Sequence, residues 1–306
     1  MNLSNYLDIA PEVRSAVVAK KPVVALESTI LSHGIHYPQN LPFAFKVEQI
    51  VREHGAIPAT MAVIDGRMKV GLSAGELELL CKREDVQKVS RSSLPIILAQ
   101  GGTGAANVAS AMILSSLAGI RVFSTSSIGG VHRNAASTMD ISADLQELAR
   151  TPVAVVTAGT PLTLDVGKTL EYLETIGVPV LGYQTSDFPT FHCRRSGYPV
   201  DCKVRSSAEA ARIARTKWDL GLLGGLVIAN PVPEAFAMDF DEMNLTIKKA
   251  LAQAGADGIS GPELTPYLSR RIAEFTAGRS VDTNIQLAFN NARIAAELAV
   301  ELAKLH

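Results

Sequence analysis

A glutamate follows an apolar, β-branched run in the segment KPVVALESTILSHG, residues 21–34. Val23–Leu26 has the composition of a buried strand, and Glu27 comes directly after it. A carboxylate buried there must be paired, protonated or used in chemistry, because an isolated buried charge is costly. The alternative is that Glu27 begins a solvated loop and has no chemical role.

Two further carboxylates lie in STMDISADLQEL, residues 137–148. Asp140 and Asp144 are four residues apart, so one helical turn could bring them to one face, where their oxygens could hold a divalent cation. The alternative is that Ser142 caps a helix and Asp144 occupies its favourable first turn. That alternative explains Asp144 better than it explains Asp140.

Two glycine-rich turns could bind an anion. GGTGAANVAS, residues 101–110, offers backbone N–H groups at the start of a helix, although it lacks the ending of a P-loop. SIGGVHR, residues 127–133, places the hydrogen-bond donors His132 and Arg133 after its glycines. Close helix packing and a solvated loop are the respective alternatives. Lys88, in QKVSRSSLP, has the pattern of an ordinary surface lysine.

The elements that would position these residues alternate between strand and helix. The patterns predict strands within residues 22–28, 94–102, 121–126, 152–159, 179–185 and 225–234, and helices within 44–55, 73–85, 103–119, 164–177 and 207–221. Asp65-Gly66, between apolar runs, predicts an antiparallel hairpin. The final quarter is expected to be helical, within 244–255, 265–278 and 284–305.

This alternation predicts an α/β fold, namely an α/β/α sandwich with a mainly parallel central sheet, formed by residues 1–306 as a single domain. Ligands of such sheets bind outside the carboxyl ends of the strands. Several expected strands end in polar or glycine-rich turns, including those after Leu26 and those around residues 124–133 and 157–160. Glu27 is therefore expected in a cleft at that edge.

Composition excludes several classes of protein. The 306 residues are 47% hydrophobic and 19% charged, with a formal net charge of −1, which argues against disorder and against a nucleic acid partner. The three cysteines have no metal-binding spacing, so a reducing compartment is expected. Residues 1–13 do not resemble a signal peptide, and no apolar run is long enough to span a membrane. We expect a cytoplasmic protein.

Several long segments, taken together, resemble the pseudouridine-5'-phosphate glycosidase family, also called the indigoidine synthase A-like family. They are KKPVVALESTILSHGIHYPQN, KVGLSAGELELL, KVSRSSLP, IGGVHR, DISADLQEL, LDVGKTLEYLETIGVPVLGYQT and NIQLAFNNA. The resemblance covers nearly the whole chain in order. It implies an α/β/α fold, a homotrimer, a divalent metal that is typically manganese, and cleavage of pseudouridine 5'-phosphate into uracil and ribose 5-phosphate.

The resemblance also implies roles for particular residues. Glu27 matches the family's acid, Asp140 its metal ligand, and Asn284 an active-site asparagine. Positions expected to contact a nucleoside, nucleotide or sugar phosphate are Lys88, on the phosphate side, Val108, Ser142, Ala143 and Asp144, with His132 as a further donor. A C-glycosidic bond requires the base carbon itself to receive a proton, and a carboxylic acid with a raised pKa is suited to deliver it.

One position departs from the family pattern. The family's nucleophilic lysine lies in AGxKSILD, whereas residues 158–165 here read AGTPLTLD, which places Pro161 at the lysine position. Proline has no amine and cannot form a Schiff base. Lys168 lies seven residues further on, about 10 Å along a helix. Further departures fall on the phosphate side, at Ala106, Asn107, Ser126 and Ser127.

Three hypotheses follow. The first is a glycosidase or lyase of this family with an altered mechanism or substrate, cleaving a nucleoside or nucleotide bond that breaks through an oxocarbenium-like state and needs no lysine. The second is ordinary C-glycosidic cleavage with a relocated amine, from Lys88 or Lys168. The third is a ligand-binding protein that has lost catalysis, and retention of the acid and the metal ligand argues against it.

Overall fold

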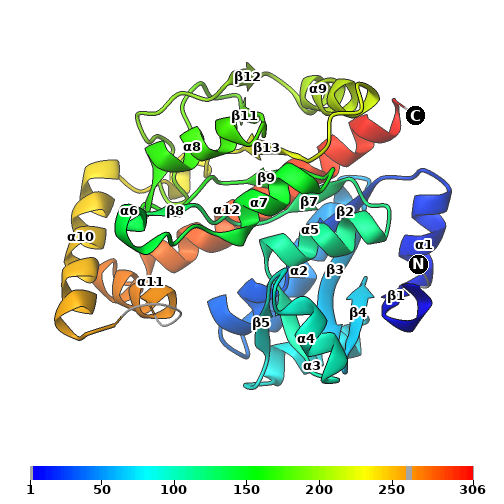
Figure 1. Cartoon of the computed structure of the whole chain (residues 1–306), viewed down its shortest axis with the longest axis horizontal. Helices are drawn as coiled ribbons and strands as arrows, with labels where there is room; N and C mark the ends of the chain where they lie inside the picture. Colours follow the sequence, from blue (N-terminus) through cyan, green and yellow to red (C-terminus); the bar gives the residue numbers. More distant parts are fainter. Residues whose placement is uncertain (1–2, 260–263, 306) are drawn as a thin grey trace.

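The computed structural model describes residues 3–259 and 264–305. Within them, a central sheet has the strand order β1-β4-β3-β2-β7-β9-β13-β11-β12, and β5 and β6 attach beside β3 (Figure 1). From β3 to β12 along this order, all neighbouring strands are parallel. The strands are β1 (Leu7–Ile9), β2 (Val23–Leu26), β3 (Ile57–Ile64), β4 (Arg67–Val70), β5 (Gln87–Val89), β6 (Gly104–Ala106), β7 (Val122–Ser124), β9 (Ala154–Thr157), β11 (Val180–Tyr183), β12 (Cys202–Val204) and β13 (Leu226–Ala229).

Successive residues of the central strands point to opposite faces of the sheet, and helices cover both faces. In β2, Val23 and Ala25 join one apolar cluster, whereas Val24 and Leu26 join another. The first cluster packs against α1 (Pro11–Val18), α5 (Val108–Leu117), α7 (Ala143–Arg150) and α8 (Val166–Thr175); the second packs against α2 (Asn40–Glu53), α9 (Ser207–Asp219) and α12 (Arg279–Ala303). The expected α/β/α sandwich with a mainly parallel sheet is confirmed.

The hairpin expected at Asp65-Gly66 is also confirmed. β3 and β4 pair antiparallel, with Ile64 opposite Arg67, and both turn residues have positive φ. A side chain at Gly66 would lie 2.7 Å from the Cα of Gly101, so only glycine fits there. α3 (Ala74–Lys82) follows, and Ser73 caps it, since the Ser73 hydroxyl accepts from the N–H of Glu76.

The strand expected within residues 94–102 is wrong. Residues Leu94–Ala99 form the helix α4, and the strand beside it is β6. Leu94 and Ile97 are buried while Ile96 is 56% exposed, which is the three-residue spacing of a short amphipathic helix. Pro95 lies in the first turn, where its missing N–H has no consequence. The apolar composition of the segment obscured this period.

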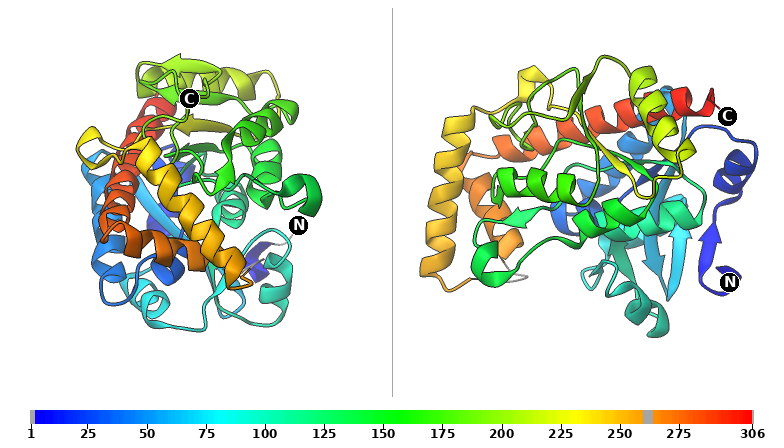
Figure 2. Two further views of the ribbon diagram at one scale, coloured as in Figure 1. Left: turned by 90° about the vertical axis from the view of Figure 1, so that its left-hand side faces the viewer. Right: turned by 45° about the horizontal axis from the view of Figure 1, so that its top comes forward.

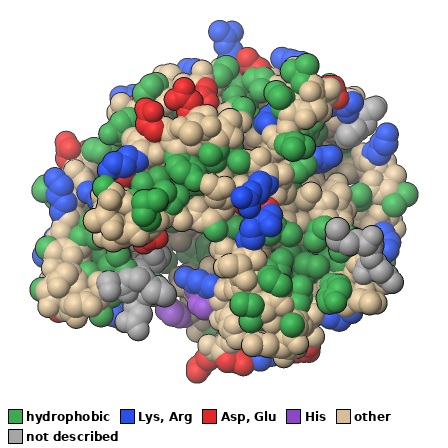
Figure 3. Space-filling model, viewed as in Figure 1, with side chains coloured by type: hydrophobic (Ala, Val, Ile, Leu, Met, Phe, Trp, Pro, Cys, Tyr) green, Lys and Arg blue, Asp and Glu red, His purple; other side chains and the backbone are tan. Residues whose placement is uncertain are grey.

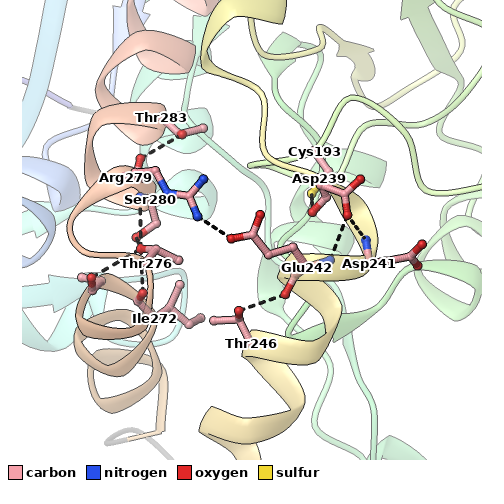
Figure 4. A network of polar contacts seen from close by, with 11 residues as sticks. Cys193, Asp239, Asp241, Glu242, Thr246, Ile272, Thr276, Arg279, Ser280 and Thr283 are labelled. Carbon is pink, nitrogen blue, oxygen red and sulfur yellow. Dashed lines mark hydrogen bonds and ion pairs between the residues drawn. The ribbon is translucent and has the colours of Figure 1, made fainter.

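The C-terminal quarter is helical, as expected. Here α10 (Phe240–Ala256), α11 (Leu264–Phe275) and α12 follow one another, and α12 runs along the sheet while α10 stands at one end of the molecule (Figure 2). Asp239 caps α10 by accepting from the N–H groups of Asp241 and Glu242. The carboxylate of Glu242 binds Arg279 at the start of α12 (Figure 4). None of the described helices is long and apolar enough to cross a membrane.

The remaining short elements complete the connections between these helices and strands. They are the helical turns η1 (Leu3–Asn5), η2 (Ile30–Gly34) and η3 (Glu234–Phe236), the helix α6 (Ala135–Thr138), and a separate two-stranded antiparallel pair formed by β8 (Val131–His132) and β10 (Leu164–Asp165).

An ion pair between a half-exposed arginine and a buried glutamate joins the segment after β5 to α7. Arg91 binds both carboxylate oxygens of Glu147, with Nε–Oε2 and Nη2–Oε1 distances of 2.5 and 2.9 Å. The Glu147 side chain is fully buried and also accepts from the Thr151 hydroxyl, whereas the Arg91 side chain is 47% exposed. This pair fixes the position of β5, and therefore of Lys88, relative to α7.

We expect Arg91→Met to lower the free energy of unfolding by about 2 kcal/mol, because it leaves a buried carboxylate without its cation. The loss in free energy of unfolding should be smaller than for a fully buried pair, because solvent screens the half-exposed Arg91. Urea denaturation measures the change. Lys82→Met, which removes an exposed pair with Glu78, is the control and should have a much smaller effect. Equal effects of the two substitutions would show that the Arg91 pair does not stabilise the fold.

Candidate active site

The carboxyl ends of β2, β7 and β9 lie side by side. Leu26 pairs with Ser124, and Ser124 pairs with Val156, so the residues that follow these strands meet at one edge of the sheet. Glu27 follows β2, and Thr125 and Ser126 follow β7. The predicted convergence of polar strand ends is confirmed for these strands.

Glu27 occupies a mostly apolar environment at this edge. A cavity of about 30 Å³ adjoins it, with Ile30, Phe43 and Ala288 in its wall. Burial raises the pKa of Glu27 from 4.5 to about 7, although hydrogen bonds from the Thr125 hydroxyl and the Ser126 N–H act in the opposite direction. A carboxyl with this pKa exchanges its proton readily near neutral pH, as a general acid must.

Lys88 lies within electrostatic reach of Glu27. Desolvation lowers the pKa of the Lys88 amine, and the negative charge of Glu27 partly offsets this. His33, in η2, is a third group of this cluster, because desolvation and then the charge of Lys88 lower its pKa. Figure 3 shows a hollow on this face of the molecule, where Lys or Arg and His side chains lie together. Lys88 is exposed, as expected for a surface lysine, but it is not isolated, because Glu27 and His33 lie within its electrostatic reach.

Asp144 organises the backbone of the cleft. Its carboxylate is buried and accepts from the N–H of Ala109, in the first turn of α5, at 3.0 Å and from the N–H of Gly129 at 2.9 Å. Burial raises its pKa, and these bonds oppose that shift. A side chain at Gly129 would lie 2.1 Å from the Ser142 hydroxyl oxygen, so this close approach requires glycine.

The expected helical face shared by Asp140 and Asp144 is wrong. Ser142 is the N-cap of α7, and its hydroxyl accepts from the N–H of Asp144 at 3.2 Å. Asp144 therefore lies in the first turn, as the capping alternative predicted, while Asp140 precedes the helix. Ala143 begins the helix and is exposed.

Asp140 pairs with His132 instead. The backbone N–H of His132 donates to the backbone carbonyl of Asp140 at 3.0 Å. The ring Nδ1 of His132 lies 3.6 Å from a carboxylate oxygen of Asp140. The Asp140 side chain is 53% exposed. No group of three or more His, Cys, Asp or Glu residues that could hold a metal occurs among the described residues. This donor set fits a divalent ion held by one carboxylate and mainly coordinated by water, rather than a closed protein cage.

Pro161 lies in the loop before β10, not at a helix start, and its carbonyl accepts from the N–H of Leu164. β10 pairs antiparallel with β8, so this loop lies near His132. Lys168 is 53% exposed, and its amine binds the carboxylate of Asp165 at 2.8 Å. Lys168 is thus held as an exposed cation on α8.

Asn284 and Val108 differ in whether their side chains could contact a ligand. Asn284, in α12, has a buried side-chain oxygen with no hydrogen-bond partner among the described residues. Such an atom is costly unless a ligand or water satisfies it, which agrees with a role in binding. The Val108 side chain packs into the core, so only its backbone at the start of α5 could contact a ligand.

Sequence reasoning did not identify Thr125, His33, Asn230 or Asn291 as parts of this site. The Asn291 amide is buried, donates to the Thr125 carbonyl at 2.9 Å, and accepts from the Asn230 amide at 2.8 Å. The available signals were weak: Thr125 follows a buried strand, and Asn291 stands on the apolar face of a helix. A buried amide on such a face needs a specific partner.

Known proteins resemble this chain over nearly its whole length. Residues 12–301 match the model of the family described as indigoidine synthase A-like protein. The pseudouridine-5'-phosphate glycosidase of Alkaliphilus metalliredigens is 55% identical to the chain, over 99% of the chain and 99% of the relative. The pseudouridine-5'-phosphate glycosidase of Escherichia coli is also 55% identical, over 98% of the chain and 96% of the relative. The structure of the prealnumycin C-glycosynthase AlnA in complex with ribulose 5-phosphate superimposes with a TM-score of 0.92, at 35% identity and 98% coverage of both chains. The chain therefore belongs to the indigoidine synthase A-like family, in which its relatives include proteins named pseudouridine-5'-phosphate glycosidase.

Proposed function

We propose that this protein is a glycosidase that cleaves the glycosidic bond of a nucleoside or nucleotide, including the pseudouridine type, to release a free base and ribose or ribose 5-phosphate. The observation that carries the proposal is the environment of Glu27, which gives a carboxyl at a strand end a pKa of about 7. The names of its relatives and the sugar phosphate named with AlnA support the substrate class.

Glu27 is proposed as the acid that protonates the departing base. Near neutral pH a large fraction of its carboxyl carries a proton, and transfer of that proton removes negative charge from the base as the bond breaks. Asn284 is proposed to orient the substrate with its unpaired oxygen. Lys88 and His132 are proposed to bind the anionic side of the substrate, with the backbone of Val108 and Ser142–Asp144 lining the same cleft.

The mechanism is proposed to differ from imine formation at the position of Pro161. Proline supplies no amine there, and Lys168 is held by Asp165 at an exposed position. Bond cleavage is therefore proposed to proceed through an oxocarbenium-like sugar that water captures.

A relocated amine is the second candidate, and one observation favours Lys88 for that role. Desolvation lowers the Lys88 pKa, which increases the neutral and nucleophilic fraction of its amine. Lys168 has no comparable environment. If Lys88 attacks the sugar, the ordinary C-glycosidic reaction would be retained with its amine on β5. A ligand-binding protein without catalysis is the third candidate.

A divalent metal, manganese by resemblance to the family, is proposed to bind at Asp140. Carboxylate oxygens and water suit this class of ion, and a bound divalent ion would supply positive charge for an anionic substrate. We also propose a homotrimeric assembly and a cytoplasmic location.

Glu27→Gln tests the acid. The amide keeps the shape but has no transferable proton, so we expect kcat to fall by about 10²- to 10⁴-fold while substrate binding persists. In the parent, the reaction should slow as pH rises through about 7, because the pKa of Glu27 is raised and its protonated form is the acid. Product release from pseudouridine 5'-phosphate and from other nucleotides measures both effects. Parental turnover by the variant would remove Glu27 from the mechanism.

Borohydride reduction in the presence of ribose 5-phosphate tests for imine formation. We expect the intact mass of the parent protein to remain unchanged, because Pro161 has no amine and the Lys168 amine is paired with Asp165. Pro161→Lys, which places an amine at the family's position, is the positive comparison. An adduct on the parent that maps to Lys88 and disappears in Lys88→Arg would contradict the proposed mechanism and establish the relocated amine.

Asp140→Ala tests the metal site. We expect the variant to bind Mn²⁺ at least tenfold more weakly, because Asp140 offers the carboxylate around which a hydrated ion would assemble. Electron paramagnetic resonance of free Mn²⁺ measures binding without reference to activity. Asp241→Ala removes another exposed carboxylate, at the start of α10, and is the matched control. Equal Mn²⁺ affinity of the parent and the Asp140 variant would show that the ion binds elsewhere.

A further inference from the structure

The Thr125 hydroxyl faces two hydrogen-bond acceptors. One is a carboxylate oxygen of Glu27, and the other is the carbonyl oxygen of Ser127, at 3.1 Å. A hydroxyl carries one hydrogen and two lone pairs, so Thr125 can donate to only one of these oxygens at a time. The charge state of Glu27 determines which oxygen receives the hydrogen.

When Glu27 is ionised it can only accept, so the Thr125 hydrogen must point to its carboxylate. When Glu27 is protonated, its own hydrogen can be donated to the Thr125 oxygen, and the Thr125 hydrogen is then free to bond the Ser127 carbonyl. Both states keep a hydrogen bond between Glu27 and Thr125. The change from one state to the other needs rotation of a single hydrogen and no movement of heavier atoms.

The surroundings hold the Thr125 backbone in place for this exchange. Thr125 is 3% exposed, and its N–H donates to the Val156 carbonyl of β9 at 3.0 Å. Its own carbonyl accepts from the Asn291 amide at 2.9 Å, and the Asn230 amide fixes Asn291 in turn at 2.8 Å. Both asparagines are buried. The hydroxyl oxygen is therefore held from a neighbouring strand and from α12.

We propose that Thr125 is a positioning residue that keeps Glu27 hydrogen-bonded before and after proton transfer, by turning its hydroxyl hydrogen between the Ser127 carbonyl and the Glu27 carboxylate. This inference rests on the proposed function in one respect, namely that Glu27 delivers the proton to the base. The O–H bond of Thr125 is not broken. The transferred proton is that of Glu27, and water restores it after the base departs.

The inference makes a signed prediction for the titration of Glu27. A hydrogen bond to an ionised carboxylate is roughly twice as strong as one to a neutral carboxyl, so its loss destabilises the ionised form more. Thr125→Val should therefore raise the pKa of Glu27 by about one unit. The charged groups that act on Glu27 are Asp144 from α7 and Lys88 from β5. His33 from η2 lies within electrostatic reach of Lys88, and Glu48 from α2 accepts from Thr60 in the cavity wall. The substitution leaves all of them in place.

Carbon-13 NMR of protein labelled at glutamate side-chain carboxyls measures this titration directly in the ligand-free protein. The Glu27 resonance is assigned by its absence from Glu27→Gln. We expect an upward shift in Thr125→Val and the parental titration in Thr125→Ser, which retains the hydroxyl. Thr276→Val is the matched control: Thr276 is also a buried threonine with hydroxyl bonds, but it lies in the helical network of Figure 4. Thr125→Ala replaces the valine variant if that protein does not fold.

The pH profile of kcat/KM provides the second readout. In Thr125→Val its descending limb should move to higher pH by the same amount as the NMR titration, and Thr125→Ser should restore the parental limb. An unchanged or lowered pKa in Thr125→Val would overturn the inference, as would a serine variant that behaves like valine. If the parent has no glycosidase activity, the proposed function fails, while the NMR titration still decides the hydrogen-bonding role of Thr125.

Discussion

The cleft depends on the hydrogen bonds that the buried carboxylate of Asp144 accepts. This carboxylate bonds the first turn of α5 and the Gly129 turn, while Ser142 caps the helix that carries it. Three segments distant in sequence are thereby held to one buried carboxyl group. Because a buried carboxylate without these donors would be strongly destabilising, the segments keep one arrangement, and Glu27 lies within electrostatic reach of the same group.

The burial that raises the pKa of Glu27 suits it to act as an acid, but it also destabilises the fold when Glu27 is ionised. Its pKa is raised from 4.5 to about 7 in the folded protein, so the fold binds this proton more tightly than the unfolded chain does. The associated stability is fully present below pH 4.5 and is lost as pH rises through 7, an effect of at most about 3 kcal/mol. The apolar wall that makes Glu27 a useful acid is thus the reason that its ionised form weakens the fold.

The sequence predicted the larger elements well because their patterns are periodic. Hydrophobic periodicity and turn residues predicted the parallel strands, the hairpin at Asp65-Gly66 and the C-terminal helices. Leu94–Ala99 was missed because a short apolar run gives too few residues to separate a helical period from a strand. The position of Glu27 at the sheet edge followed from a general rule, whereas its partners Thr125 and Asn291 did not. Their contacts join residues far apart in sequence, and only the folded chain brings them together.

The order of elements along the chain has a consequence for synthesis. α12 follows all the strands in sequence, yet it covers one face of the sheet and carries both Asn284 and Asn291. During translation, α2 and α9 emerge first and pack on this face, but the contacts that Val24, Leu26 and Val156 share with α12 form only after α12 leaves the ribosome. The nascent sheet therefore exposes part of this apolar face until synthesis of the chain is nearly complete, and chaperones bind such surfaces. Docking of α12 closes that surface and supports the Thr125 loop in the same event.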